Sequence, residues 1–156
     1  MQASFIRKSE NKAEMAEKFM KTYEYFDVTA DIGFKAYGND LNEAFENASV
    51  AMFNIITDTA NVRPTKEFKF EIDSEDEVSL LYDYLEELLF YHEVEFMLFS
   101  EFHVEIDNNL HLEAKILGEE IDWQKHERKT EIKAITFHKM DVRKTDHVEL
   151  QAIVDL

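Results

Sequence analysis

The sequence predicts an α+β fold in which two amphipathic helices pack on an antiparallel or mixed β-sheet within a single domain. Only two segments repeat their apolar residues at helical spacing, and a strand-like segment separates them. After the second of these segments, apolar and polar residues alternate as they do in strands. Helices that occur singly, followed by a run of strands, favour this class over a doubly wound parallel sheet.

The first helix follows two short strands, which are expected at 23–28 and 32–38. It begins at Asp40, a candidate N-cap residue, and Glu43 three residues later completes the pattern of a capping box. Its apolar residues share one face, which is therefore expected to be buried. These residues are Leu41, Ala44, Phe45, Ala48, Met52 and Phe53.

The second helix follows a strand expected at 67–73, where phenylalanines alternate with charged residues. Ser74 and Glu77 predict a second capping box, and the acidic first turn suits the helix dipole. The inner stripe of this helix is expected to consist of Leu81, Tyr84, Leu85, Leu88 and Leu89.

The remaining elements are predicted to be strands. Two alternating segments, "SEFHVEID" and "LHLEAKIL", flank Asn108 and Asn109, residues that tolerate left-handed turn geometry, so a hairpin is expected there. In the expected register His103 lies opposite Ala114, and the histidines of the two strands do not form a facing pair of ligands. Two final strands are expected at 131–144 and 147–156.

The composition restricts the class of partner. Lys and Arg number 17 against 34 Asp and Glu, a formal net charge of −17 that repels phosphate backbones. Divalent cations and basic protein surfaces therefore fit better than stable, direct nucleic-acid binding. The chain has no cysteine, which excludes disulfides and thiolate chemistry. No secretory signal and no apolar run of the ~20 residues that a membrane span needs is visible, so we expect a cytoplasmic protein without a membrane partner.

The common enzyme motifs are missing from the sequence. Three glycines, at 33, 38 and 118, are too dispersed to form a phosphate-binding loop, and there is no HExxH motif or nucleophile elbow. No catalytic residue and no residue that binds an organic cofactor is therefore assigned.

Two carboxylates have no structural explanation in the predicted fold. Asp31 interrupts the strand-like segment 28–38, although aspartate is depleted in strands, and Asp155 lies at the end of the last strand. If the last strand pairs with the first ones, both carboxylates meet the main chain at Leu156. Hard cations such as Ca²⁺ take carboxylate and main-chain oxygens as ligands. The hypothesis is therefore a cation site at this point.

The order of several segments resembles the archease family. These segments are "TADIGFKAYG" (29–38), "LNEAFENASVAMF" (41–53), "LLYDYLEELLFYHEVE" (80–95), "KAITFHKMDV" (133–142) and "VDL" (154–156). The resemblance covers residues 23–156 as an archease-like domain and leaves residues 1–22 as an N-terminal extension. The family usually has a histidine immediately before Thr-Ala-Asp, whereas this chain has Val28.

The resemblance implies an accessory protein of tRNA splicing rather than an enzyme. It would promote guanylylation and multiple turnover of the RtcB-type RNA ligase through an acidic face that a divalent cation stabilises. The implied ligands, expected to hold Ca²⁺, are Asp31, Asp155 and a main-chain or terminal oxygen of Leu156. Two alternatives stay open: a metal-dependent hydrolase that uses Asp31, His138 and Asp155, and a structural ion-binding or chaperone-like module.

Overall fold

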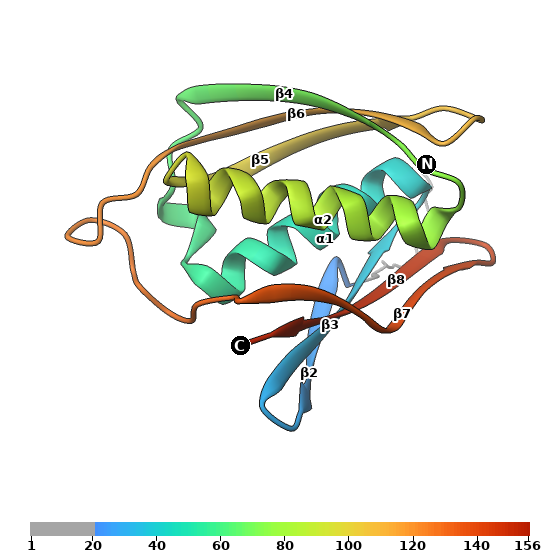
Figure 1. Cartoon of the computed structure of the whole chain (residues 1–156), viewed down its shortest axis with the longest axis horizontal. Coiled ribbons are helices and arrows are strands. Elements are labelled where there is room, and N and C mark those ends of the chain that lie inside the picture. Colours follow the sequence, from blue (N-terminus) through green and yellow to red (C-terminus); the bar gives the residue numbers. More distant parts are fainter. Residues whose placement is uncertain (1–20) are drawn as a thin grey trace, which may run out of the picture.

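Two helices lie between two antiparallel sheets in the computed structural model, which describes residues 21–156 (Figure 1). The predicted extension, residues 1–22, lies outside the described residues except for its last two. One sheet has the order β2 (Tyr23–Val28), β3 (Asp31–Gly38), β8 (Val148–Asp155) and β7 (Ala134–Lys144). The other sheet has the order β4 (Lys66–Asp73), β6 (His111–Glu120) and β5 (Met97–Ile106).

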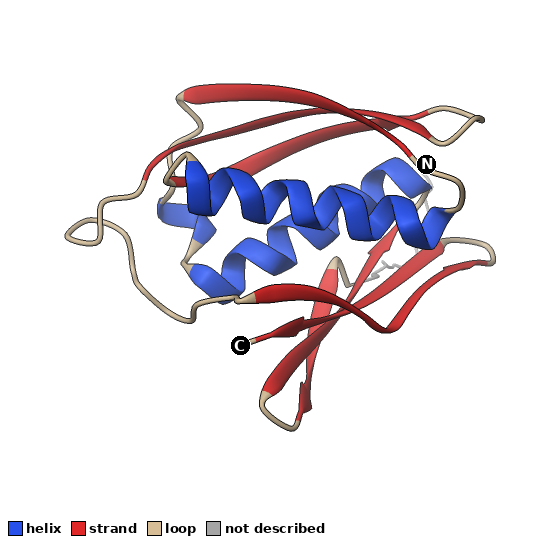
Figure 2. Ribbon diagram, viewed as in Figure 1, coloured by secondary structure: helices blue, strands red, loops and turns tan. Residues whose placement is uncertain are grey.

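The helices form the middle layer (Figure 2). They are α1 (Leu41–Ile56) and α2 (Glu77–Val94), and the short 3₁₀ helix η1 (Thr59–Asn61) follows α1. Helix α1 packs on β3 and β8 of one sheet and on β5 of the other, and α2 contacts β7, β4 and β5. The predicted α+β class with two helices is confirmed. The prediction was a single sheet, whereas the structure has two. Helix α1 can pack on both sheets because apolar residues cover enough of its surface.

The N-terminus of α1 has the predicted cap. The Asp40 carboxylate accepts a hydrogen bond of 2.8 Å from the Glu43 backbone N–H, and the Glu43 carboxylate accepts one of 2.7 Å from the Asn39 N–H. The predicted second capping box is wrong. Asp76 caps α2 by accepting from the Ser79 N–H at 2.8 Å, and the Ser74 hydroxyl donates to Asp83 instead. Aspartate is as good an N-cap residue as serine, so the spacing alone did not distinguish the two.

The long connection between β6 and β7 is held by Glu119, whose side chain is only 13% exposed. It accepts hydrogen bonds from the Arg63 backbone N–H at 2.8 Å, from Lys125 Nζ at 2.7 Å and from His126 Nε2 at 3.0 Å. Burial alone would raise the pKa of the Glu119 carboxyl, but the three hydrogen bonds outweigh burial and lower this pKa to about 2. Glu119 is therefore a charged anchor within the fold.

We predict that Glu119→Gln lowers the free energy of unfolding by about 1–3 kcal/mol at pH 7, because hydrogen bonds to a charged group are lost. Urea denaturation measures this change. The control is Glu120→Gln, since Glu120 is 73% exposed and forms only a surface ion pair with Lys66. Because the folded pKa of Glu119 lies below its ordinary value of 4.5, its contribution is complete above about pH 4.5 and is lost as the pH falls towards 2. Equal stability of the two variants would contradict the anchoring role.

No helix within residues 21–156 has both the length and the apolar composition that crossing a membrane requires.

Candidate functional site

Asp31 and Asp155 lie directly opposite each other on the neighbouring strands β3 and β8. Residues paired in this way in antiparallel strands have Cα atoms about 4.5–5.5 Å apart and side chains on the same face of the sheet. A two-residue turn at Thr29 and Ala30 begins β3 at Asp31, and Ala30 adopts a left-handed φ of 65°. The structure thus brings together the two predicted carboxylates, which are 124 positions apart in the chain.

Asp31 belongs to a row of paired residues, one from each strand, that crosses the four-stranded sheet. Val28 of β2 pairs with Asp31, and Ala134 of β7 pairs with Asp155. Val28 therefore offers the site an apolar side chain and no additional ligand. The Lys133 N–H donates a hydrogen bond of 2.8 Å to the Asp155 backbone carbonyl, and the Leu156 side chain packs against the core. These contacts hold the end of the chain next to the row.

Gly33, two residues after Asp31, has a packing role. It pairs with Phe26 of β2, and a Cβ atom at position 33 would overlap the Phe26 ring. The ring therefore lies over the glycine on the face of the sheet that also carries the two aspartates. On the other side of Gly33, Ile153 of β8 pairs with the glycine. Ile153 is 1% exposed, although its side chain faces away from the helices.

The two aspartates are electrostatically uncompensated within residues 21–156. Like charges directly opposite each other in a sheet are destabilising. Asp31 is half-buried and Asp155 is exposed, and neither side chain forms a hydrogen bond or an ion pair with another residue of this part of the chain. A divalent cation between them would remove the repulsion, and the oxygen donors fit the preference of Ca²⁺.

His138 does not join this site, contrary to the arrangement that the hydrolase alternative requires. It lies four residues along β7 from Ala134, which corresponds to more than about 10 Å of strand. It is exposed in an irregular part of β7, between Thr136 and Asp141, where the pairing with β8 is interrupted. The three residues Asp31, His138 and Asp155 therefore do not form a catalytic group.

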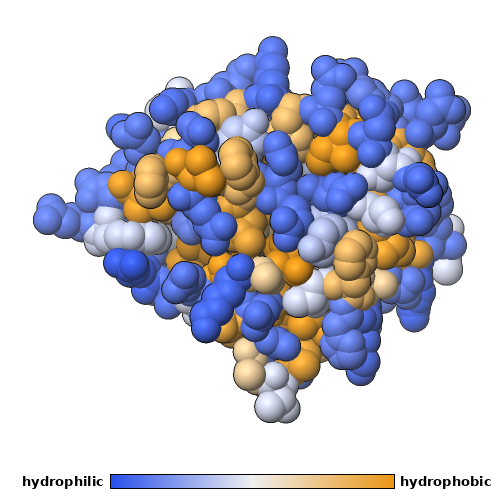
Figure 3. All heavy atoms as spheres, in the orientation of Figure 1, coloured by the Kyte–Doolittle hydropathy of each residue, from blue (hydrophilic) through white to orange (hydrophobic). Residues whose placement is uncertain are grey.

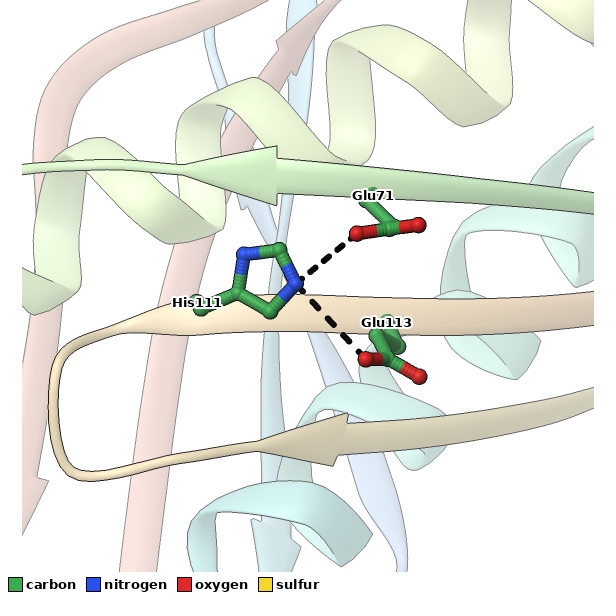
Figure 4. Close-up of side chains that lie close together, drawn as sticks. All are labelled: Glu71, His111 and Glu113. Carbon is green, nitrogen blue, oxygen red and sulfur yellow. Dashed lines mark ion pairs between the residues drawn. The ribbon is translucent and has the colours of Figure 1, made fainter.

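A second group of carboxylates, which the sequence analysis missed, lies on the outer face of the three-stranded sheet (Figure 4). Here His111 of β6 lies 3.0 Å from Glu71 of β4 and 3.7 Å from Glu113 of its own strand, measured from Nε2. Its Nδ1 lies 2.8 Å from Asp73 Oδ1. Both ring nitrogens of His111 thus face carboxylates, so ion pairing accounts for this group.

The group around His111 was missed because it depends on which strands pair with each other, and the spacing of residues along the sequence does not show this. Glu71 is opposite Glu113, and Glu113 is in turn opposite Glu105 of β5. The expected hairpin register was also wrong by one residue, because His103 pairs with Lys115. The turn contains four residues, 107–110, in which the Asp107 carboxylate accepts from the backbone N–H groups of two later residues. The only sequence signal was the run of charged residues at alternate positions.

These features define a class of protein: a small α+β domain with two helices between antiparallel sheets and a pair of facing carboxylates where strands β3 and β8 meet. A sequence model of the archease protein family (MTH1598/TM1083) matches residues 23–156. The chain belongs to the archease family.

Individual relatives agree with this assignment. The chain is 54% identical over 141 residues to the protein archease of Methanothermobacter thermautotrophicus, with 88% of this chain and 100% of the relative covered. It is 49% identical over 139 residues to that of Sulfurisphaera tokodaii, with the same coverage. The solution structure of protein 1598 from Methanobacterium thermoautotrophicum superimposes with a TM-score of 0.79 at 53% identity, over 88% of this chain and all of that one.

The ion-pair group on the three-stranded sheet predicts a pH-dependent signal. The hydrogen bond to Asp73 raises the pKa of His111 above its ordinary value of 6.5. The pairing therefore stabilises the fold below about pH 6.5 and is lost as the pH rises through the higher, folded pKa. We expect NMR titration to find the His111 pKa above 6.5, and to find it lowered in Asp73→Asn. Glu67→Gln, on the same strand, is the control and should leave the His111 pKa unchanged; an unaltered pKa in Asp73→Asn would contradict the pairing.

Proposed function

We propose that this chain is an accessory protein that activates the RtcB-type tRNA-splicing RNA ligase in the cytoplasm, promoting its guanylylation and multiple turnover. Membership of the archease family supports the proposal. The observation that carries it is the pairing of Asp31 with Asp155 on the outer face of the four-stranded sheet, where neither carboxylate has a partner within residues 21–156. Such a pair suits an acidic contact site better than a structural ion pair.

The proposed site binds a divalent cation, expected to be Ca²⁺. The carboxylates of Asp31 and Asp155 would hold it, with a main-chain oxygen of Leu156 as a further donor. The cation would offset the repulsion between the two strands and join the beginning of β3 to the end of β8. The protein's own contribution is the register of the two strands, which positions the carboxylates before a cation arrives.

The charge of the chain supports a basic partner. A net charge of −17 attracts the positively charged cleft that a ligase needs for guanylate and RNA. Because exposed charges are screened over about 8–10 Å at physiological ionic strength, this association should weaken with salt. The activator would then leave before the RNA substrate enters the same cleft.

We predict that replacing Asp31 has opposite effects on stability in the absence and in the presence of the cation. In EDTA, Asp31→Asn should unfold at the same temperature as the native chain or at a higher one, because the like-charge pair is gone. In Ca²⁺ at 100 times the Kd, the native chain should gain about 2.7 kcal/mol and the variant should gain nothing. Thermal denaturation measures both effects.

The matched control for this experiment is Asp27→Asn. Asp27 is an exposed residue of β2 that pairs with Ile32, so it lies close to the site but outside the row. It should keep the full stabilisation by Ca²⁺. Equal stabilisation of Asp31→Asn and the native chain by Ca²⁺ would overturn the proposed cation site.

A ligation assay tests the proposed activity. A cognate RtcB-type ligase should turn over many times with the native chain and stay close to a single turnover without it. We expect Asp31→Asn to reduce the gain at least ~10-fold, whereas Asp27→Asn keeps it. A native chain that increases neither guanylylation nor turnover would refute ligase activation and leave the structural ion-binding alternative.

A further inference from the structure

Most of the exposed large hydrophobic side chains of residues 21–156 lie on α2 or on segments next to it. Among residues 21–156 five such side chains are exposed, and four of them belong to α2, to the residues just after it or to the part of β7 that packs against it. They are Phe90, Val94, Phe96 and Phe137, with exposed fractions from 47% to 66%. Figure 3, viewed as Figure 1, shows hydrophobic side chains scattered among hydrophilic ones on the face that α2 crosses.

The geometry of α2 places its own outward-facing apolar residues on one side of the helix. At ~100° per residue, Tyr82, Phe90 and Val94 fall within the same third of the helix circumference. The acidic residues Glu86 and Glu93 fall between them, and the buried residues of α2 occupy the rest of the circumference, with Leu89 only ~20° from Tyr82. The outer side of α2 is therefore a continuous mixture of apolar and acidic groups, here called the α2 surface.

The strand β7 adds an aromatic ring to this surface. Phe137 lies where the pairing of β7 with β8 is interrupted, and its ring stacks on Tyr82 with ring centroids 3.8 Å apart and planes 9° apart. One face of the Phe137 ring covers Tyr82, and 56% of the side chain remains exposed. Stacking thus holds a large apolar group in one orientation while it stays available for contact.

Phe96 has an unusual backbone conformation for a residue of its size. It follows the C-cap residue Glu95 with a left-handed φ of 57°, at a position where helices usually have glycine. The Ile121 N–H donates a hydrogen bond of 2.8 Å to the Phe96 carbonyl and holds this conformation. The side chain is nevertheless 66% exposed, so the strain brings no burial of the ring.

The charged side chains that α2 itself contributes to the α2 surface are all carboxylates, although Arg128 lines a pocket with Glu93 and Phe96 at the end of the helix. The helix contains no Lys or Arg. Within residues 21–156, Asp83, Glu86, Glu93 and Glu95 form no ion pair, whereas Glu71 and Glu113 on the three-stranded sheet pair with His111. Unpaired carboxylates beside exposed aromatic rings match a partner that has basic side chains beside an apolar groove.

We propose that the α2 surface is a docking surface for a protein partner whose groove is apolar and bordered by Lys and Arg. Phe90 and Phe137 would enter the groove, and the surrounding carboxylates would meet its basic rim. A second copy of this chain is not the occupant, because it would place two acidic helices against each other. The identity of the partner rests on the proposed function: it is the ligase, which the α2 surface would hold while the Asp31–Asp155 site acts separately.

Alanine substitutions test this surface. The affinity of the full chain for a cognate RtcB-type ligase is measured by titration calorimetry with Phe90→Ala and Phe137→Ala, whose folding is checked by circular dichroism. Each variant should bind at least ~10-fold more weakly, as central aromatic residues of interfaces do. Folded variants that both bind within twofold of the native chain would overturn the proposal.

A charge reversal tests the acidic component. Glu86→Lys should weaken binding and reduce its dependence on salt, whereas Glu105→Lys makes the same charge change on the outer face of β5 and should have a smaller effect. Equal losses from the two reversals would mean that only net charge matters, which contradicts a defined docking surface.

Two further outcomes are distinguished by the same samples. If the native chain does not bind the ligase at all, both the proposed function and the assigned partner are refuted. If binding survives the loss of both rings, only the proposed docking surface is refuted. Sedimentation equilibrium of the chain by itself should show a monomer. A dimer that Phe90→Ala dissociates would assign the α2 surface to a second copy and overturn the proposal.

Discussion

The antiparallel pairing of β3 with β8 is the constraint on which the rest of the structure depends. Phe34 and Ala36 of β3 and Leu150 and Ala152 of β8 face the helices and are nearly fully buried. A shift of one residue would move these side chains to the opposite face. Burial of one large apolar side chain contributes about 1.5–3 kcal/mol, whereas a like-charge pair on a sheet costs a few tenths to about 1 kcal/mol. The core therefore holds Asp31 opposite Asp155 against their repulsion.

Much of this arrangement was predictable because it depends on local patterns. Helical spacing identified both helices and their buried faces, and the two aspartates stood out because strands rarely contain them. Pairings between distant strands were not predictable, so the second sheet and the group around His111 were missed. The hydrophobic pattern also left the role of Gly33 open, since the reason for a glycine there is the ring of Phe26 on the neighbouring strand.

The two acidic places on the sheets differ in how their charge is balanced. On the three-stranded sheet, His111 lies within ion-pair distance of three carboxylates, so the group is a closed structural unit. On the four-stranded sheet, the facing aspartates have no partner within residues 21–156. Strand β7 connects this second place to the α2 surface, because Ala134 lies beside Asp155 and Phe137, three residues later, stacks on Tyr82. Cation binding and docking would thus involve the two ends of one short segment.

The pairing of β3 with β8 also has a consequence for biosynthesis. Asp31 leaves the ribosome 124 residues before Asp155, its partner on β8. The central strand pair, and with it the facing aspartates, cannot form while the chain is still being translated up to residue 155. Contacts between such distant segments form late and slowly in folding. A chain that lacks β8 would keep both helices but would have no carboxylate opposite Asp31.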